Sequence, residues 1–250
     1  MSASEVADGV TAYWDARAPR FDGAAAHVRS PDDWTKVLAA AFCVDGPKDV
    51  VDLGTGTGAC ALAAASLGHR VRAYDGSARM LAVACAAAGK AGLDIEFVQA
   101  LITDAPLEPA SADIVTIRNV LWTLERPGEA LQVARRTLRP GGRVVVSDGM
   151  WSVAPGERSD YAGDLAARLP FHAGLREVDA QDLLKAEGFT EVVAWQHLFR
   201  SAPYPGDVPM FVLSARRDDP GQNFRSKPDR KEDGPIANHA KTEHPPRQYE

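Results

Sequence analysis

The chain has 250 residues, of which 45% are hydrophobic and 25% are charged, and its formal net charge is -6 at pH 7. This composition predicts a globular protein with one large domain and a small appendage, and the acidic charge argues against a nucleic-acid partner. We find no apolar run long enough to span a membrane, no signal-peptide pattern, and only three widely spaced cysteines. We therefore expect a cytoplasmic monomer or homodimer without a membrane partner, a metal site or a disulfide framework.

Two helix-like segments open the chain. They cover residues 4–17 and 31–42, and residues 18–30 join them. Because both segments precede the first predicted strand, we expect residues 1–45 to form a helical cover over the edge of the sheet or over its ligand-binding rim.

Short runs rich in valine and isoleucine alternate with helical segments through the middle of the chain. Strands that are buried on both faces have this composition, and their alternation with helices predicts a parallel sheet with helices on both faces. The predicted fold class is therefore α/β, with a doubly wound, mostly parallel sheet. The predicted strands are residues 49–53, 70–75, 95–99, 113–118, 142–149, 191–200 and 208–217, and the predicted helices between them are residues 59–68, 77–92, 126–142 and 179–189.

The rhythm changes after the fifth predicted strand. Residues 150–178 read as an irregular insertion, which we interpret as a substrate cap within a main domain of residues 46–217. The final segment, residues 218–250, is rich in proline and charge and poor in aliphatic residues. Such a composition buries too little apolar surface to offset the entropy of ordering, so we predict a disordered C-terminal tail.

The segment VVDLGTGTG, residues 50–58, places three glycines at alternate positions between a predicted strand and a predicted helix. A turn with almost no side chains lets a ligand approach the backbone, and ligands of open α/β sheets bind at this point. Asp75 ends the second strand, where a carboxylate can accept hydrogen bonds from both hydroxyls of a ribose. Asp52 precedes the turn, where it would repel a pyrophosphate but attract a ligand that carries an ammonium and a sulfonium.

Three motifs follow one another between residues 48 and 150: VVDLGTGTG, VRAYDGSARML and SADIVTIRNVLWTLERPGEALQVARRTLRPGGRVVVSDG. In this order they resemble the motifs of the class I S-adenosylmethionine-dependent methyltransferases, in particular the small-molecule enzymes related to the ubiquinone and menaquinone methyltransferases. The resemblance implies a Rossmann-like sheet of seven strands with an antiparallel final strand, and S-adenosylmethionine as the cofactor. Carried over position by position, it implies the cofactor-binding residues Asp52, Gly54, Gly56, Gly58, Asp75, Gly76, Met80 and Arg118.

One segment departs from the family pattern. After the third strand the family has an aspartate near the adenine amino group, whereas this chain has Leu101 and Ile102. We therefore expect backbone groups and apolar packing at these two residues to hold the adenine. A register shift would instead bring Thr103 and Asp104 to the adenine.

The N-terminal segment is similar to the family helix that closes over the cofactor. Tyr13 and Arg20 combine polar tips with this location, so we predict that at least one of them binds the cofactor. Trp14 and Phe21 are predicted substrate contacts, with docking of the helix on the core as their alternative role.

Substrate-binding and proton-accepting residues are expected on the rim of the sheet. The turn after the fourth strand and the insertion 150–178 supply aromatic and polar side chains that can stack on a flat ring. His27 and His172 are the candidate catalytic bases, because histidine titrates near neutral pH. His197 lies in a predicted strand and is expected to be structural. The candidate substrate-binding residues are Trp14, Phe21, Asn119, Trp122, Trp151, Tyr161, Phe171 and Arg176.

These features predict an enzyme that moves a methyl group from S-adenosylmethionine to oxygen, nitrogen or carbon of a small aromatic or heteroaromatic metabolite. The reaction would be an in-line displacement, for which the protein chiefly positions the reactants and excludes water. Two alternatives stay open: a nicotinamide-dependent oxidoreductase, and an S-adenosylmethionine-binding protein without transferase activity.

Overall fold

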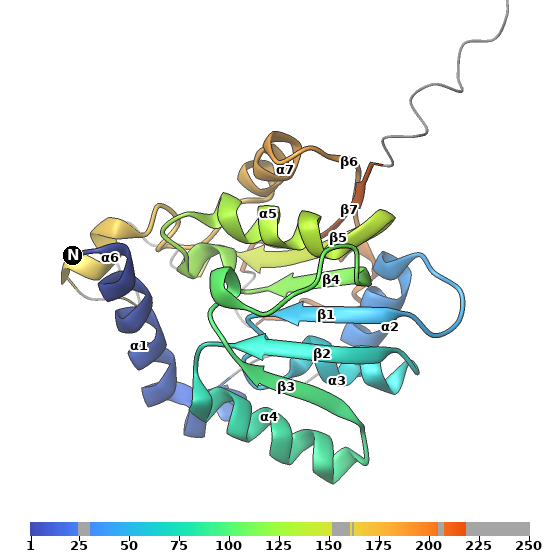
Figure 1. Cartoon of the computed structure of the whole chain (residues 1–250), viewed down its shortest axis with the longest axis horizontal. Coiled ribbons are helices and arrows are strands. Elements are labelled where there is room, and N and C mark those ends of the chain that lie inside the picture. Colours follow the sequence, from blue (N-terminus) through green and yellow to red (C-terminus); the bar gives the residue numbers. More distant parts are fainter. Residues whose placement is uncertain (25–30, 152–160, 162, 205–207, 219–250) are drawn as a thin grey trace, which may run out of the picture. The chain divides into compact units, whose positions relative to one another are not determined.

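A seven-stranded sheet forms the centre of the structure, with helices on both faces (Figure 1). The computed structural model describes residues 1–24, 31–151, 161, 163–204 and 208–218. The predicted base His27 and residues 219–250 of the predicted tail lie outside the described residues. The helices are α1 (Ala3–Ala24), α2 (Pro31–Phe42), α3 (Ala59–Ser66), α4 (Ala78–Ala91), α5 (Pro127–Thr137), α6 (Gly163–Arg168) and α7 (Glu177–Ala186), with short 3-10 turns η2 (Ile102–Asp104), η3 (Leu121–Thr123) and η4 (Gln196–Leu198). The strands are β1 (Asp49–Leu53), β2 (Arg70–Asp75), β3 (Ile95–Gln99), β4 (Ala112–Arg118), β5 (Leu138–Gly149), β6 (Phe189–Ala194) and β7 (Met210–Arg217).

The strand order is β3-β2-β1-β4-β5-β7-β6. The first five strands in this order run parallel, and β7 pairs antiparallel with both β5 and β6. The predicted mostly parallel sheet with an antiparallel final strand is therefore confirmed. The final strand lies inside the sheet, and β6 forms the edge. Helix α1 lies beyond the carboxyl ends of β1 and β2, where Figure 1 shows the arrowheads of the strands.

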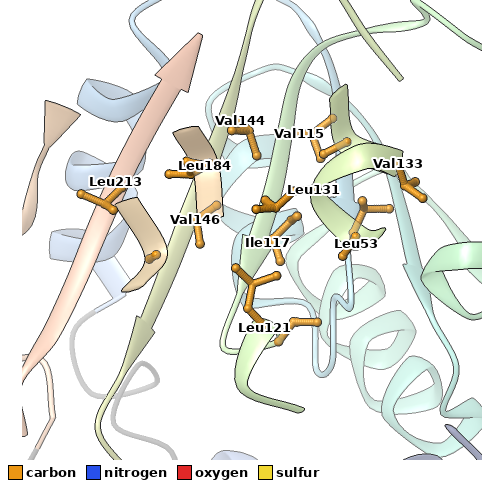
Figure 2. Packing of buried hydrophobic residues seen from close by; sticks show 14 of the residues in the cluster. Leu53, Val115, Ile117, Leu121, Leu131, Val133, Val144, Val146, Leu184 and Leu213 are labelled. Atoms are coloured by element: carbon orange, nitrogen blue, oxygen red, sulfur yellow. The ribbon is translucent and has the colours of Figure 1, made fainter. Parts of the chain in front are cut away.

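The core has one layer on each face of the sheet. Figure 2 shows Leu131 of α5 beside Ile117 of β4, and Leu184 of α7 near Val146 of β5. Trp34 and other apolar residues of α2 and α3 pack on the opposite face. Full burial of each large aliphatic side chain contributes about 1.5–3 kcal/mol, so the two layers hold the carboxyl ends of the strands in fixed relative positions.

The first helix is longer than the sequence pattern indicates. We predicted that a linker begins at residue 18, but α1 continues through Pro19 to Ala24. A proline inside a helix costs about 3 kcal/mol, yet Ala18 is fully buried and the ring of Phe21 packs edge-on against Trp14 at 5.7 Å. Tertiary packing thus overrides the local preference of the proline to end the helix.

Two other boundaries differ from the prediction. Strand β5 begins at Leu138 and not at Gly142, because Leu138 pairs with Ala112 before a register shift carries the chain through residues 139–142. His197 lies in a 3-10 turn and not in a strand. Strand β6 ends at Ala194, and the next residue, Trp195, donates its indole N–H to Ser214 of β7 at 2.9 Å. This hydrogen bond holds the start of the turn against β7.

An ion-pair cluster fastens the amino ends of the strands. Asp49 accepts hydrogen bonds from Arg70 Nε at 2.7 Å and from Arg139 Nη2 at 2.9 Å. The same Arg139 pairs with Asp113 at 3.0 Å, so the cluster joins β1, β2, β4 and β5. The hydrogen bond from Arg70 is the largest of the effects that lower the pKa of Asp49, and burial opposes it.

We expect Asp49→Asn to lower the free energy of unfolding at pH 7 by about 1 kcal/mol, since these partly exposed pairs are screened by solvent. A lowered folded-state pKa gives stability that is full above the unfolded pKa near 3.9 and is lost as the pH falls through the folded value. The difference between wild type and variant should therefore vanish near pH 2. Urea unfolding at both pH values measures it, and a difference independent of pH would contradict the assignment.

In the described part of the chain, no helix combines the length and the apolar character that crossing a membrane requires.

Candidate functional site

The turn between β1 and α3 holds three glycines in left-handed backbone conformations. Their φ angles are +68° at Gly54, +56° at Gly56 and +91° at Gly58. A Cβ at Gly54 would lie 2.5 Å from Cγ2 of Val120, and a Cβ at Gly58 would lie 3.1 Å from Cβ of Ala84. A Cβ at Gly56 would meet nothing within 4 Å. The outer two glycines therefore let protein groups approach, and Gly56 has open space where a Cβ would lie.

Asp52 lies beneath this turn. Its side chain is 1% exposed, and its carboxylate accepts hydrogen bonds from the hydroxyls of Thr55 at 2.6 Å and Thr116 at 2.5 Å. Burial raises the pKa of Asp52, and the two hydroxyls oppose that rise. Asp52 is not among the residues that line the cavity, so its predicted place near the ligand ammonium, directly or through water, stays a prediction. The carboxylate faces inward and braces the turn against β4.

Asp75 occupies the position that the sequence predicts, at the end of β2. Its two carboxylate oxygens accept hydrogen bonds from the backbone N–H groups of Gly56 and Ser77, each at 2.8 Å. Burial is the largest cause of its raised pKa, and these N–H groups act in the opposite direction. Each oxygen of a carboxylate has a second lone pair, so both can also accept a hydrogen bond from a ligand hydroxyl.

Helix α1 is tied to the segment that follows Asp75. The hydroxyl of Ser77 donates a hydrogen bond to Asp15 at 2.5 Å and accepts one from the backbone N–H of Met80 at 3.0 Å. Asp15 also accepts from the backbone N–H of Arg79 at 3.3 Å. Ser77 thus caps α4 as predicted and at the same time anchors the cover helix.

A single cavity of about 530 Å³ extends from the glycine turn beneath α1 to the far side of β4. Its volume lies within the range of about 300–1,000 Å³ that is usual for small-molecule sites. The structure therefore brings most of the predicted binding residues into one space. The predicted residues that line it are Trp14, Phe21, Gly54, Gly56, Asp75, Gly76, Met80, Leu101, Ile102, Arg118, Asn119, Trp122 and Trp151.

Several predicted site residues do not line this cavity. Tyr13 and Tyr161 pack on each other at 4.4 Å and form a second layer, since Tyr161 lies 5.4 Å from Trp122. Phe171 packs against the core on the same face as α5 and α7. His172 lies in the turn before α7 and is not part of the described lining.

Two predicted arginines are not among the residues that line the cavity. Arg20 is exposed on α1, so the described structure gives it no contact with a ligand in the cavity. Arg176 precedes α7, and its guanidinium makes two hydrogen bonds to Asp179 at 2.6 and 2.7 Å while its side chain stays 64% exposed. The guanidinium of Arg176 is therefore occupied by the carboxylate of Asp179 in the first turn of α7, which competes with any ligand for it.

On the glycine side of the cavity, made by the glycine turn, Asp75, Met80 and residues 101–103, the segment after β3 adds a polar side chain that the main prediction missed. Leu101 and Ile102 line it as predicted, and Thr103 lines it as well. Asp104 is exposed and not among the lining residues, so only the threonine of the two shifted-register candidates reaches the cavity.

The aromatic side of the cavity is walled by Trp14, Phe21, Trp122, Trp151 and Tyr204. Trp14 and Trp122 meet edge-on at 6.0 Å, and Trp151 lies 6.4 Å from Trp122. Such rings present both faces and edges to a ligand, which suits a flat ring system.

Sequence reasoning missed Tyr204 and several residues of α1 and of the turn before α5. Tyr204 stands in a proline-rich connection without periodicity, so no local signal marks it as a site residue. The remaining missed lining residues are Ala3, Val6, Ala7, Val10, Thr11, Thr55, Thr57, Ala59, Ser77, Val120, Thr123, Leu124, Glu125, Arg126, Glu129 and Ala130.

Asp148 is a buried carboxylate behind this aromatic wall. It accepts hydrogen bonds from the indole N–H of Trp151 and the backbone N–H of Gly149, both at 2.9 Å, and from the backbone N–H of Trp122 at 3.4 Å. Complete burial raises the pKa of Asp148 to about 7, against the effect of these donors. Asp148 therefore joins the two tryptophans and keeps a proton at a pH where an exposed aspartate has lost it.

We expect Asp148→Asn to remove a pH dependence of stability. The raised folded-state pKa means that the contribution of Asp148 is fully present below about pH 4 and is lost as the pH rises through about 7. Between pH 5 and pH 8 the wild type should lose roughly 2–3 kcal/mol more unfolding free energy than the variant. Urea unfolding at both pH values measures the difference. The exposed Asp45→Asn is the control, and parallel pH profiles for wild type and Asp148→Asn would refute the expectation.

Comparison with known proteins identifies relatives of the chain. The model of a family described as a methyltransferase domain matches residues 51–146. The chain is 31% identical over 166 residues to a demethylmenaquinone methyltransferase of Paenarthrobacter aurescens, a match that covers 65% of this chain and 64% of the relative. It is 30% identical over 166 residues to a demethylmenaquinone methyltransferase of Renibacterium salmoninarum, covering 65% of this chain and 68% of that relative.

The fold is also found among solved structures. The crystal structure of the [4+2]-cyclase SpnF superposes with a TM-score of 0.58 at 20% sequence identity, covering 74% of this chain and 80% of that one. At this level of identity the likeness concerns the fold alone. The chain spans less than two thirds of the length of the Paenarthrobacter relative.

Proposed function

The chain belongs to the class I S-adenosylmethionine-dependent methyltransferases of the quinone methyltransferase type, and on this premise we propose that it methylates a small aromatic or heteroaromatic acceptor. The observation that carries the proposal is that one cavity joins the glycine turn and Asp75 to a wall of aromatic rings. Methyl donor and acceptor must share one space for an in-line transfer, and this cavity offers each of them a side of suitable chemistry.

The glycine side fits S-adenosylmethionine. Asp75 would accept hydrogen bonds from the ribose hydroxyls, and Gly56, where a Cβ would meet nothing within 4 Å, would let the ligand lie against the backbone. Met80 and Leu101 would pack on the adenine, with Thr103 as its polar neighbour. When bound, this cofactor supplies a methyl group that its sulfonium has already activated.

The protein's part in the transfer would be to orient the acceptor, exclude water and take up a proton where the acceptor carries one. The acceptor ring would lie against Trp14 and Trp122, stacked on one of these perpendicular indoles and meeting the edge of the other, and α1 would shield it from solvent. The relatives are named for a quinone substrate, which agrees with a flat ring against these indoles. Of the two histidines proposed as bases, His172 does not line the cavity, and His27 remains the candidate for acceptors that lose an O–H or N–H proton.

Label transfer tests the proposal. The protein is incubated with S-adenosylmethionine labelled in its methyl group and with hydroxylated ring systems such as 1,4-dihydroxynaphthalene and 8-hydroxyquinoline, and the extracted rings are assayed for label. We expect transfer by the wild type. Tight binding of S-adenosylhomocysteine without transfer to any ring in a broad panel would favour a binding protein without transferase activity. A larger thermal shift with NAD than with S-adenosylhomocysteine would instead favour an oxidoreductase.

A further inference from the structure

Tyr204 lies in the connection between β6 and β7, but its hydroxyl reaches the carboxyl end of β4. It accepts hydrogen bonds from Arg118 Nη2 at 3.0 Å and from Asn119 Nδ2 at 3.1 Å. All three residues line the aromatic side of the cavity. The connection thus brings a phenol to the point where β4 ends, 86 residues further along the chain than Arg118.

The remaining hydrogen-bonding capacity of this cluster points to a ligand. A tyrosine hydroxyl has one hydrogen to donate and two lone pairs, and here both lone pairs are occupied by Arg118 and Asn119. Among the described residues nothing accepts the hydrogen of the Tyr204 hydroxyl, and nothing pairs with the buried Nε of Arg118 or the buried Oδ1 of Asn119. The two buried atoms have almost no accessible surface, so a ligand cannot reach them directly, but the hydroxyl of Tyr204, which lines the cavity, can donate its hydrogen to a polar group of a ligand.

The position of the hydroxyl is fixed by packing. The Tyr204 ring lies 5.0 Å from Trp151 at an angle of 77° and 6.3 Å from Trp34 at 69°, both edge-to-face arrangements. The phenol therefore stands at the end of the aromatic wall and cannot turn away without losing both contacts.

The positive charge of Arg118, beside the Tyr204 hydroxyl, favours an electron-rich group of a ligand. Within the described lining, Glu125 pairs with Arg168, and Arg126 pairs with Glu129 at 2.9 Å. Arg118 has no carboxylate within 4.0 Å among the described residues, and its guanidinium lies 4.1 Å above the Trp34 ring. From beyond salt-bridge distance its charge lowers the pKa of the buried carboxyls of Asp52 and Asp148, and it can also attract a ligand oxygen that carries negative charge.

We propose that Tyr204 is an acceptor-binding residue that donates its hydroxyl hydrogen to an oxygen on the acceptor ring, next to Arg118. The acceptor would accordingly be an oxygenated ring, such as a phenol or an enol, held by this oxygen while its face rests on the tryptophans. This inference rests on the proposed function, because it assumes that the aromatic side receives the methyl acceptor.

A binding comparison that needs no turnover tests the inference. Protein saturated with S-adenosylhomocysteine is titrated with 1-naphthol and with 1-methylnaphthalene, which have the same ring system and differ in the oxygen. We expect wild type to bind 1-naphthol about tenfold more tightly than 1-methylnaphthalene. Tyr204→Phe, which keeps the ring and its edge-to-face contacts, should abolish that preference. Tyr74→Phe, which removes the hydroxyl of a buried tyrosine that does not line the cavity, should keep it.

The outcomes separate this inference from the proposed function. A preference that survives in Tyr204→Phe, or wild-type protein that does not prefer 1-naphthol, overturns the role of Tyr204 even if label transfer succeeds. An oxygen preference that depends on Tyr204, in a protein that transfers no label to any ring, supports the binding residue and rejects the methyltransferase activity.

Discussion

Asp75→Ala is expected to weaken the binding of S-adenosylhomocysteine by about 10²- to 10⁴-fold, while the protein stays folded. Two hydrogen bonds from ribose hydroxyls to a buried carboxylate contribute about 1.5–3 kcal/mol each, and tenfold in affinity corresponds to about 1.4 kcal/mol. The fold should tolerate the change because the loss of a buried charge offsets the loss of the bonds from Gly56 and Ser77. Isothermal titration calorimetry measures the affinity, and the melting temperature reports on folding.

The exposed Asp94→Ala is the matched control for this experiment, since it removes a carboxylate far from the cavity lining. At saturating cofactor the rate of methyl transfer by Asp75→Ala should stay near that of the wild type, because Asp75 would contact the ribose and not the reacting methyl. Unchanged affinity for S-adenosylhomocysteine would remove Asp75 from the binding site and shift the register of the whole assignment.

Gly54→Ala is expected to destabilise the fold by about 2–5 kcal/mol. The left-handed conformation at φ +68° costs a residue with a Cβ about 1–2 kcal/mol, and overpacking adds about 1–3 kcal/mol because the new Cβ would lie 2.5 Å from Val120. Gly46 offers a matched control: its φ is +67°, but a Cβ there would meet nothing within 4 Å. Gly46→Ala should therefore show the conformational cost alone, and urea unfolding measures both variants.

The double variant Gly54→Ala/Val120→Ala separates the two costs of the first substitution. Removing the two methyl groups of Val120 should relieve the clash but not the backbone strain, so the effects of the two single substitutions should not add. Equal destabilisation by Gly54→Ala and Gly46→Ala would show that the turn shifts freely and that Val120 does not restrict it.

The sequence predicts the sheet well because buried parallel strands are short, β-branched and bounded by turns. Residues 49–53, 70–75 and 95–99 form strands with the predicted bounds. The failures occur where tertiary contacts outweigh local preference. Pro19 does not end α1, because Ala18 and Phe21 on either side of it pack on other residues.

The candidate site divides in the same way. The glycine side could be predicted because its residues follow the strands directly, and the ends of parallel strands meet at one edge of a sheet. Asp52 is the exception, since its position along the chain was identified but its inward direction depends on Thr116 of another strand. Tyr204 and Asp148 make contacts between distant segments, to Arg118 and to the backbone N–H of Trp122, and Arg176 is paired with Asp179 in the first turn of α7. No spacing in the sequence encodes the contacts of Tyr204 and Asp148, whereas the pairing of Arg176 with Asp179 follows a local i, i+3 spacing.

The ion pairs of Asp49, Arg139 and Asp113 join the strands at their amino ends. The aromatic side of the cavity lies at the carboxyl ends, where α1, the turn after β4 and the connection that carries Tyr204 supply its residues. Mutations that change the shape of the aromatic side therefore do not alter these ion pairs. The same separation makes the chain a suitable starting point for directed evolution, with libraries confined to the segments beyond the carboxyl ends of the strands.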